Sequence, residues 1–132
     1  MKRLLLFVLF GLTLTLSEKR QKVVDCAKSK IGTPYETLDC SGLTRFCYRK
    51  VGIELSTIAH NQFRHGKAVS KDNLKPGDIV GFNNHDGKEQ PGHVGIFIGG
   101  DSYIHSPSKG KTVQYGSLSS NRNFYGGRRY LD

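Results

Sequence analysis

The sequence predicts an α+β domain in which N-terminal helices pack on a small antiparallel β-sheet. Two observations support this fold class. In the first half of the chain apolar residues recur at three and four positions, which is the helical period, whereas the second half has short apolar stretches between glycine-rich turns. The length of 132 residues suits one domain. It excludes Rossmann-type and barrel enzymes, because these folds need longer chains.

The first 17 residues differ from the rest. Residues 2–3 are basic, residues 4–16 form a largely apolar run, and polar residues follow from Ser17 onward. This run is shorter than the roughly 20 residues that a membrane-spanning helix needs, and its length suits the apolar core of a secretory signal. We therefore expect residues 1–17 to be a signal peptide or N-terminal anchor, and the protein to be exported to the periplasm, cell envelope or medium. A buried first helix is the alternative. Residues 18–132 would form the domain.

Three segments of the first half have the helical period. The predicted helices cover residues 17–31, 40–51 and 57–65. Ser17 is a candidate N-cap of the first helix, and Asp39 or Ser41 can cap the second by accepting hydrogen bonds from free backbone amides. Cys40 therefore stands at the N-terminus of a helix.

Short strands are predicted for the second half. They cover residues 78–82, 93–98, 102–106, 111–115 and 126–131, with a polar loop at 83–92. The sequence Gly-Gly-Asp at residues 99–101 is typical of a tight hairpin turn. In a hairpin centred on this turn, His93 and His105 should lie opposite one another.

The chain is basic, with 20 lysines and arginines against 11 acidic residues and a net charge of +9. Such a charge favours a polyanionic partner. The basic residues are scattered and no predicted helix has a continuous basic face, so we expect no nucleic-acid partner. For an exported protein, anionic envelope polymers or lipids offer the same attraction.

Cys40, His93 and His105 are the candidate catalytic residues. A thiol is a strong nucleophile only as the thiolate, and a helix N-terminus with a nearby imidazole lowers its pKa. Cys40 has the helix N-terminus, and the predicted hairpin brings the two histidines together. A nucleophile, a base and a group that orients the base are sufficient for covalent acyl transfer by a cysteine.

Two other interpretations of these residues remain open. Cys40, His93 and His105 could bind a metal ion, although they lack the paired ligand spacing that is typical of zinc sites. Cys26 and Cys47 are expected to be buried thiols on their helices, but in an oxidising compartment they could form a disulfide. That pairing would leave Cys40 as the odd thiol.

Four ordered segments resemble the NlpC/P60 family of cysteine peptidases. They are residues 39–43 (DCSGL), 74–80 (LKPGDIV), 92–99 (GHVGIFIG) and 103–105 (YIH). The resemblance runs from about residue 23 to residue 131. It implies a papain-like α+β fold and hydrolysis of peptide bonds in the stem peptides or cross-links of peptidoglycan, without a metal or an organic cofactor.

The resemblance also implies roles for individual residues. Cys40 corresponds to the nucleophile, His93 to the general base, and His105 to the polar third member that fixes the imidazole. Tyr35, in the segment GTPY at residues 32–35, resembles a tyrosine that lines the site in the family, although here it stands only five residues before the cysteine. Asp39 and Ser41 flank the nucleophile and are candidate oxyanion or substrate-binding residues, as is Tyr35.

The predicted function is therefore that of a monomeric cell-wall hydrolase that uses a Cys-His-His thiol mechanism on peptidoglycan peptides. Two alternatives remain. Related cysteine folds include amidases and acyltransferases, which would act on a different bond. A non-catalytic envelope-binding module, in which the three residues are vestigial, is the second alternative.

Overall fold

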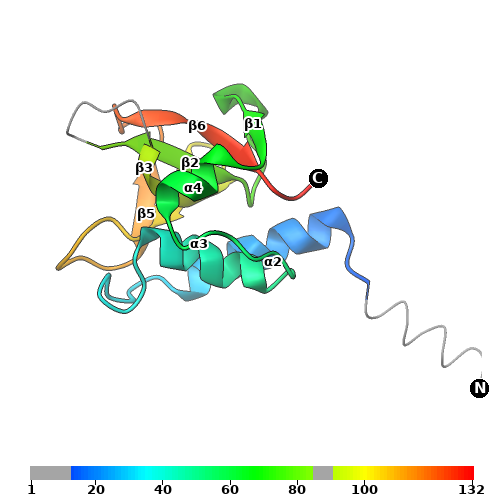
Figure 1. Cartoon of the computed structure of the whole chain (residues 1–132), viewed down its shortest axis with the longest axis horizontal. Helices are drawn as coiled ribbons and strands as arrows, with labels where there is room; N and C mark the ends of the chain where they lie inside the picture. Colours follow the sequence, from blue (N-terminus) through cyan, green and yellow to red (C-terminus); the bar gives the residue numbers. More distant parts are fainter. Residues whose placement is uncertain (1–12, 85–90) are drawn as a thin grey trace, which may run out of the picture.

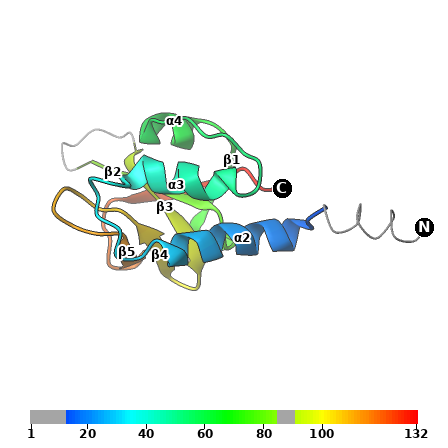
Figure 2. The ribbon, with the colours of Figure 1, turned by 90° about the horizontal axis from the view of Figure 1, so that it is seen from below.

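The structure is a computed structural model that describes residues 13–84 and 91–132. Three helices lie against one face of a six-stranded antiparallel sheet (Figures 1 and 2). The helices are α2 (Leu16–Ser29), α3 (Cys40–Arg49) and α4 (Ala59–Arg64). The predicted α+β class, with N-terminal helices on a small antiparallel sheet, is confirmed.

The strand order in the sheet is β1-β6-β2-β3-β4-β5. The strands are β1 (Lys67–Val69), β2 (Ile79–Asn83), β3 (Pro91–Gly99), β4 (Ser102–His105), β5 (Gln114–Ser117) and β6 (Phe124–Arg129). All five predicted strands are present, with ends shifted by one to three residues. Strand β1 was not predicted, because three residues are too few to establish an alternating pattern.

Helix α2 begins earlier than the sequence indicates. Its N-cap is Thr15 and not Ser17, since the Thr15 hydroxyl accepts a hydrogen bond from the Glu18 amide while the Glu18 carboxylate accepts one from the Thr15 amide. This reciprocal capping box satisfies two free amides of the first turn. The predicted boundary at residue 17 thus falls inside the first turn of α2.

Residues 1–12, most of the predicted signal or anchor segment, lie outside the described residues. Within residues 13–84 and 91–132, no helix is long and apolar enough to cross a bilayer. Most of the predicted polar loop at 83–92 also lies outside the described residues, and its two ends belong to strands β2 and β3.

The hydrophobic core has two parts, one on each face of the sheet. On the helix face, Leu43 and Cys47 of α3 pack with Ile79, Val94 and Ile96 of the sheet. The alternate residues of the same strands point to the other face, where they form a smaller cluster of Val80, Phe82, Phe97, Tyr103 and Leu118. This alternation is the period of two that a strand buried on both sides requires.

All three cysteines are free thiols in the structure. Cys47 is fully buried between α3 and the sheet, as expected, and Cys26 is buried on α2. The disulfide that the sequence left open is therefore not formed here. A hydrogen bond between the two side chains joins Cys26 to Cys47.

The register of the β3–β4 hairpin differs from the expected one by two residues. Ile96 lies opposite Ile104 and Phe97 opposite Tyr103, with an irregularity before Gly99. Gly95 therefore faces His105, and a Cβ at position 95 would lie only 2.9 Å from the Ile104 carbonyl oxygen. His93 and His105 are diagonal neighbours on one face and not directly opposed. Long side chains still meet across such a diagonal.

Candidate active site

A cleft of about 520 Å³ opens at the N-terminus of α3, between that helix and the middle of the sheet. Cys40, His93 and His105 all line it, so the structure brings the three predicted catalytic residues together. Tyr35 also lines the cleft. The other described lining residues are Phe82, Asn83, Asn84, Gly92, Pro107, Ser108, Lys111, Asn121 and Asn123.

Cys40 is the first residue of α3 and is 8% exposed. Asp39 is the N-cap, and its carboxylate accepts a hydrogen bond of 2.8 Å from the Gly42 amide. Because the helix begins here, the Cys40 amide has no partner within the helix. The sulfur lies against β3, where it accepts a hydrogen bond from the backbone amide of Val94, the residue after His93.

Burial raises the pKa of the Cys40 thiol above its ordinary value. The amides of Val94, Ser41 and Cys40 lower that pKa, and the Asp39 carboxylate adds to the increase. The position at a helix N-terminus predicted a lowered pKa, because a helix N-terminus stabilises a thiolate. The effect of desolvation on the pKa exceeds the effect of the helix N-terminus, because the thiolate would be removed almost completely from water. Cys40 is therefore a neutral thiol in the unliganded cleft.

His93 and His105 form one hydrogen-bonded unit. Nε2 of His93 lies 2.7 Å from Nδ1 of His105. If His93 is to take a proton from a thiol, its Nδ1 must be unprotonated, so its Nε2 carries the hydrogen and donates it to His105. His105 then has its own proton on Nε2. In this tautomer, Nδ1 is the nitrogen of His93 that remains for Cys40.

Aromatic rings hold the two imidazoles in place. The Phe82 ring centroid lies 5.7 Å from that of His93, and the Tyr103 centroid lies 4.8 Å from that of His105. Phe82 and Tyr103 also contact each other, with centroids 4.8 Å apart. Asn121 donates a hydrogen bond of 3.1 Å to the Tyr103 hydroxyl. The second core thus fixes the orientation of both histidines.

Both histidines are neutral at physiological pH. Burial lowers the pKa of His93 to about 4, with a smaller contribution from the charge of His105. Burial also lowers the pKa of His105 to about 4, and the nearby charge of Lys111 contributes. A neutral thiol next to a neutral imidazole is a pair in which one proton transfer creates both the nucleophile and the acid.

Tyr35, Asp39 and Ser41 occupy different positions. Tyr35 lines the cleft, and its pKa is raised by burial and by the neighbouring Cys40. The side chains of Asp39 and Ser41 are not among the lining groups. Asp39 caps α3, and the Ser41 hydroxyl donates a hydrogen bond of 2.9 Å to the Thr57 carbonyl, which ties the start of α3 to the segment before α4.

The short connection between Tyr35 and Cys40 is braced by the loop that follows β4. The Tyr35 amide donates a hydrogen bond of 3.0 Å to the Lys111 carbonyl, and Pro34 forms a β-bridge with Thr112. The Glu36 carboxylate accepts a hydrogen bond of 2.9 Å from the Gly110 amide. These contacts fix the backbone of Tyr35 beside the cleft although few residues separate it from Cys40.

The other polar lining residues were not predicted from the sequence; they are Ser108, Lys111 and the four asparagines at 83, 84, 121 and 123. They lie at the ends of strands and in loops, and no spacing rule links them to a cysteine. The pair Asn83-Asn84 directly after a predicted strand was the only available signal, because loop residues after a strand often line a site.

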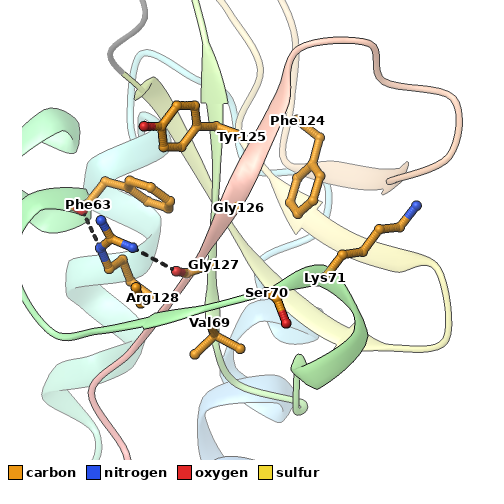
Figure 3. A pocket seen from close by; sticks show the side chains of 10 residues that line it. Phe63, Val69, Ser70, Lys71, Phe124, Tyr125, Gly126, Gly127 and Arg128 are labelled. Atoms are coloured by element: carbon orange, nitrogen blue, oxygen red, sulfur yellow. Dashed lines mark hydrogen bonds between the residues drawn. The ribbon is translucent and has the colours of Figure 1, made fainter.

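A second hollow lies on the other side of α4, beside β1 and β6 (Figure 3). Phe63 of α4 and Phe124 and Tyr125 of β6 line it, and Arg128 donates a hydrogen bond of 2.6 Å to the Phe63 carbonyl. Its described lining contains no Cys, His, Asp or Glu. It therefore lacks the thiol and imidazole that the cleft at Cys40 brings together, and that cleft is the candidate active site.

The model of the NlpC/P60 family matches residues 19–128 of the chain. The chain belongs to the NlpC/P60 family. The predicted family is thus confirmed, and the match extends from the first turn of α2 to the last residues of β6.

Relatives of this NlpC/P60 domain include proteins that are named as peptidases or probable peptidases. A gamma-D-glutamyl-L-lysine dipeptidyl-peptidase of Bacillus cereus is 33% identical over 83% of this chain, and a probable endopeptidase of Corynebacterium glutamicum is 35% identical over 74%. The matching regions are 36% and 48% of those relatives, so this chain spans between one third and one half of their length.

Solved structures show the same fold. An NlpC/P60 family protein of Bacillus cereus superimposes with a TM-score of 0.79 at 32% identity, over 86% of this chain and 40% of the other. The NlpC/p60 domain of the peptidoglycan hydrolase SagA superimposes with a TM-score of 0.72 at 30% identity, over 83% of this chain and 97% of the other. This domain therefore has the architecture of a family that includes peptidases and peptidoglycan hydrolases.

Proposed function

We propose that this protein is a cysteine endopeptidase that hydrolyses peptide bonds in the stem peptides or cross-links of peptidoglycan. The observation that carries the proposal is the position of Cys40 in one cleft with the hydrogen-bonded pair His93 and His105. The names of the relatives, which include a dipeptidyl-peptidase and a peptidoglycan hydrolase, support the substrate class.

The first chemical step forms an acyl-enzyme. As Cys40 Sγ attacks the scissile carbonyl carbon, its proton passes to Nδ1 of His93, which is the general base. The hydrogen bond from His93 Nε2 to His105 Nδ1 stabilises the imidazolium that results. His93 then donates this proton to the leaving amine, and the C–N bond breaks.

The second step releases the product. His93, neutral again, accepts a proton from a water molecule, which attacks the thioester carbon. The C–S bond then breaks, and His93 returns the proton to Cys40 Sγ, which frees the carboxylic acid product and the thiol. Each attack places negative charge on the carbonyl oxygen. The backbone amide of Cys40, which has no partner within α3, and the Tyr35 hydroxyl are the proposed donors to that oxygen. Asp39 and Ser41 support this geometry through the backbone of the first turn.

Buried, neutral catalytic groups suit this mechanism. A thiol with a raised pKa is protected from reaction when no substrate is bound, and a neutral His93 is ready to accept its proton. The mechanism needs no metal ion. Within residues 13–84 and 91–132, no group of three His, Cys, Asp or Glu side chains has the geometry to hold one.

The test is digestion of purified peptidoglycan by the wild-type protein, with the products identified by mass. Release of peptides with a new terminus inside the stem or the cross-link is expected, and treatment with a chelator should not reduce it. Products cut at the bond between sugar and peptide would establish the amidase alternative. Release of no fragment by the wild type would support a non-catalytic envelope-binding module.

The proposed location is the cell envelope, where peptidoglycan is accessible, and the proposed state is a monomer. The positive net charge of +9 suits association with anionic envelope polymers. Fractionation of cells that express the full chain tests the location, because a protein that remains entirely in the cytoplasm would contradict export.

A further inference from the structure

The cleft has one positive charge and no negative charge among its described lining residues. The thiol, the phenol and both imidazoles are neutral near pH 7, because burial shifts the pKa of each toward its uncharged form. The remaining polar side chains are a serine and four asparagines. Lys111 is therefore the one lining residue with a full charge.

The backbone of Lys111 is fixed. Its carbonyl accepts a hydrogen bond of 3.0 Å from the Tyr35 amide, and its amide donates one of 3.1 Å to the Ser108 carbonyl. Lys111 thus belongs to the part of the cleft lining that the loop after β4 contributes. Its charge acts on His105, which places the ammonium close to the catalytic histidines.

The ammonium of Lys111 is free to bind a ligand. It forms no ion pair in the part of the chain that the structure describes, and its side chain is exposed to the cleft. Lys109, two residues earlier in the same loop, also forms no ion pair among the described residues, but its position differs. Its charge acts on Glu36, and it does not line the cleft.

We propose that Lys111 is a specificity-determining residue whose ammonium binds a free carboxylate that the substrate carries next to the scissile amide. This inference rests on the proposed function. In a γ-D-glutamyl peptide, the amide formed by the side-chain carboxyl leaves the α-carboxylate of the same residue free. Amidation of that group gives a carboxamide of nearly the same shape and no charge, so Lys111 would distinguish the two peptides.

The discrimination should be about tenfold in kcat/KM, because a charge-assisted hydrogen bond is worth roughly 1.5 kcal/mol or more when it is partly shielded from water. Lys111→Met removes the ammonium and keeps a similar length of apolar side chain. Lys111→Arg keeps the charge. Lys109→Met removes a charge from the same loop outside the cleft and is the matched control.

The experiment compares two synthetic peptides that differ only in carboxylate or carboxamide at the glutamyl α-position. The wild type, Lys111→Arg and Lys109→Met should all prefer the carboxylate peptide about tenfold. In Lys111→Met the ratio of the two kcat/KM values should fall to about one. Because any effect of Lys111 on the proton transfers of His93 and His105 is the same for both peptides, the ratio isolates the contact with the carboxylate.

Binding to Cys40→Ala, measured by calorimetry, separates the two proposals. An affinity about tenfold higher for the carboxylate peptide, which is lost when Lys111→Met is added, would support the role of Lys111. This holds even if the wild type cleaves neither peptide, because that result would overturn the proposed function alone. Equal affinity for the two peptides in Cys40→Ala, or an unchanged preference after Lys111→Met, would overturn the role of Lys111.

Discussion

Two polar clusters, one at Asp78 directly before β2 and one at His93 of β3, differ in how fully their groups are paired. In the first, the Asp78 carboxylate is completely buried and binds Arg20 of α2 at 3.0 Å and Arg129 of β6 at 2.8 Å, together with the Lys75 amide at 2.8 Å. Arg20 also donates to the carbonyls of Pro76 and Leu131. Every charge in this cluster has an opposite charge or a dipole beside it.

The second cluster is the candidate site, where Cys40 is buried and His93 is partly buried, and neither has an opposite charge beside it. Burial therefore shifts the pKa of each toward the neutral form. Asp78, the residue before β2, joins α2 to β6, and its cluster stabilises the fold. The groups around Cys40 can still accept a proton and contact a substrate. The comparison teaches that paired buried charge supports structure, whereas unpaired buried groups next to a cleft are available for chemistry.

Replacement of the nucleophile should have the largest effect. We expect Cys40→Ala to lower peptide release from peptidoglycan by at least about 10⁴-fold, because no other group in the cleft can form the acyl-enzyme. The melting temperature should change little, since the change removes one sulfur atom. The control is Cys47→Ala on the same helix, which should lower stability and keep activity. Appreciable cleavage by Cys40→Ala would contradict the assignment of the nucleophile.

A substitution in the Asp78 cluster should lower stability and leave activity largely unchanged. Asp78→Asn leaves two buried guanidinium groups without a counter-charge, so we expect the free energy of unfolding to fall by about 3–5 kcal/mol. Activity well below the melting temperature should be retained. Glu54→Gln, which removes the charge from exposed ion pairs with Arg45 and Arg49, is the control and should change stability far less. Equal losses in the two variants, measured by urea unfolding, would remove the distinction.

Stability should also depend on pH through the two histidines of the cleft, which have no opposite charge beside them. An unfolded His93 binds a proton below about pH 6.5, whereas the folded residue, with a pKa of about 4, does not. The unfolded state thus gains protons first, and stability falls as the pH drops from about 6.5 to 4, by about 3 kcal/mol for His93. Above pH 6.5 this contribution is constant.

Urea unfolding at pH 7.5 and 4.5 measures that loss. Carboxylates titrate in the same range, so the comparison is with the double variant His93→Gln, His105→Gln. The double variant should lose less stability than the wild type on acidification. An identical loss in both proteins would show that the histidines are not held neutral by the fold.

His105 should have the smallest effect of these four. It contacts His93 and acts as a positioning residue, so we expect His105→Ala to lower kcat about 10- to 100-fold with little change in KM. His105→Asn, which can still accept a hydrogen bond from His93 Nε2, should recover part of the loss. If the alanine and asparagine variants are equally active, the hydrogen bond between the histidines does not contribute to catalysis.

Local sequence signals predicted most of the fold. The helical period and the cap at Asp39 placed Cys40 at the start of α3, and the turn at residues 99–101 placed the two histidines on one hairpin. These features depend on interactions between residues close in the sequence. The hairpin register was wrong by two residues, because the sequence does not reveal the irregularity near Gly99.

What the sequence by itself determined is the set of reactive residue types and their order along the chain: Cys40 at a helix start, and His93 and His105 on neighbouring strands. Only the tertiary structure decided their protonation and their surroundings. The pKa of Cys40 depends on how much water the sheet and the loops exclude. Lys111 and the asparagines reach the cleft because distant segments pack together, and neither packing nor desolvation is recorded in the spacing of residues.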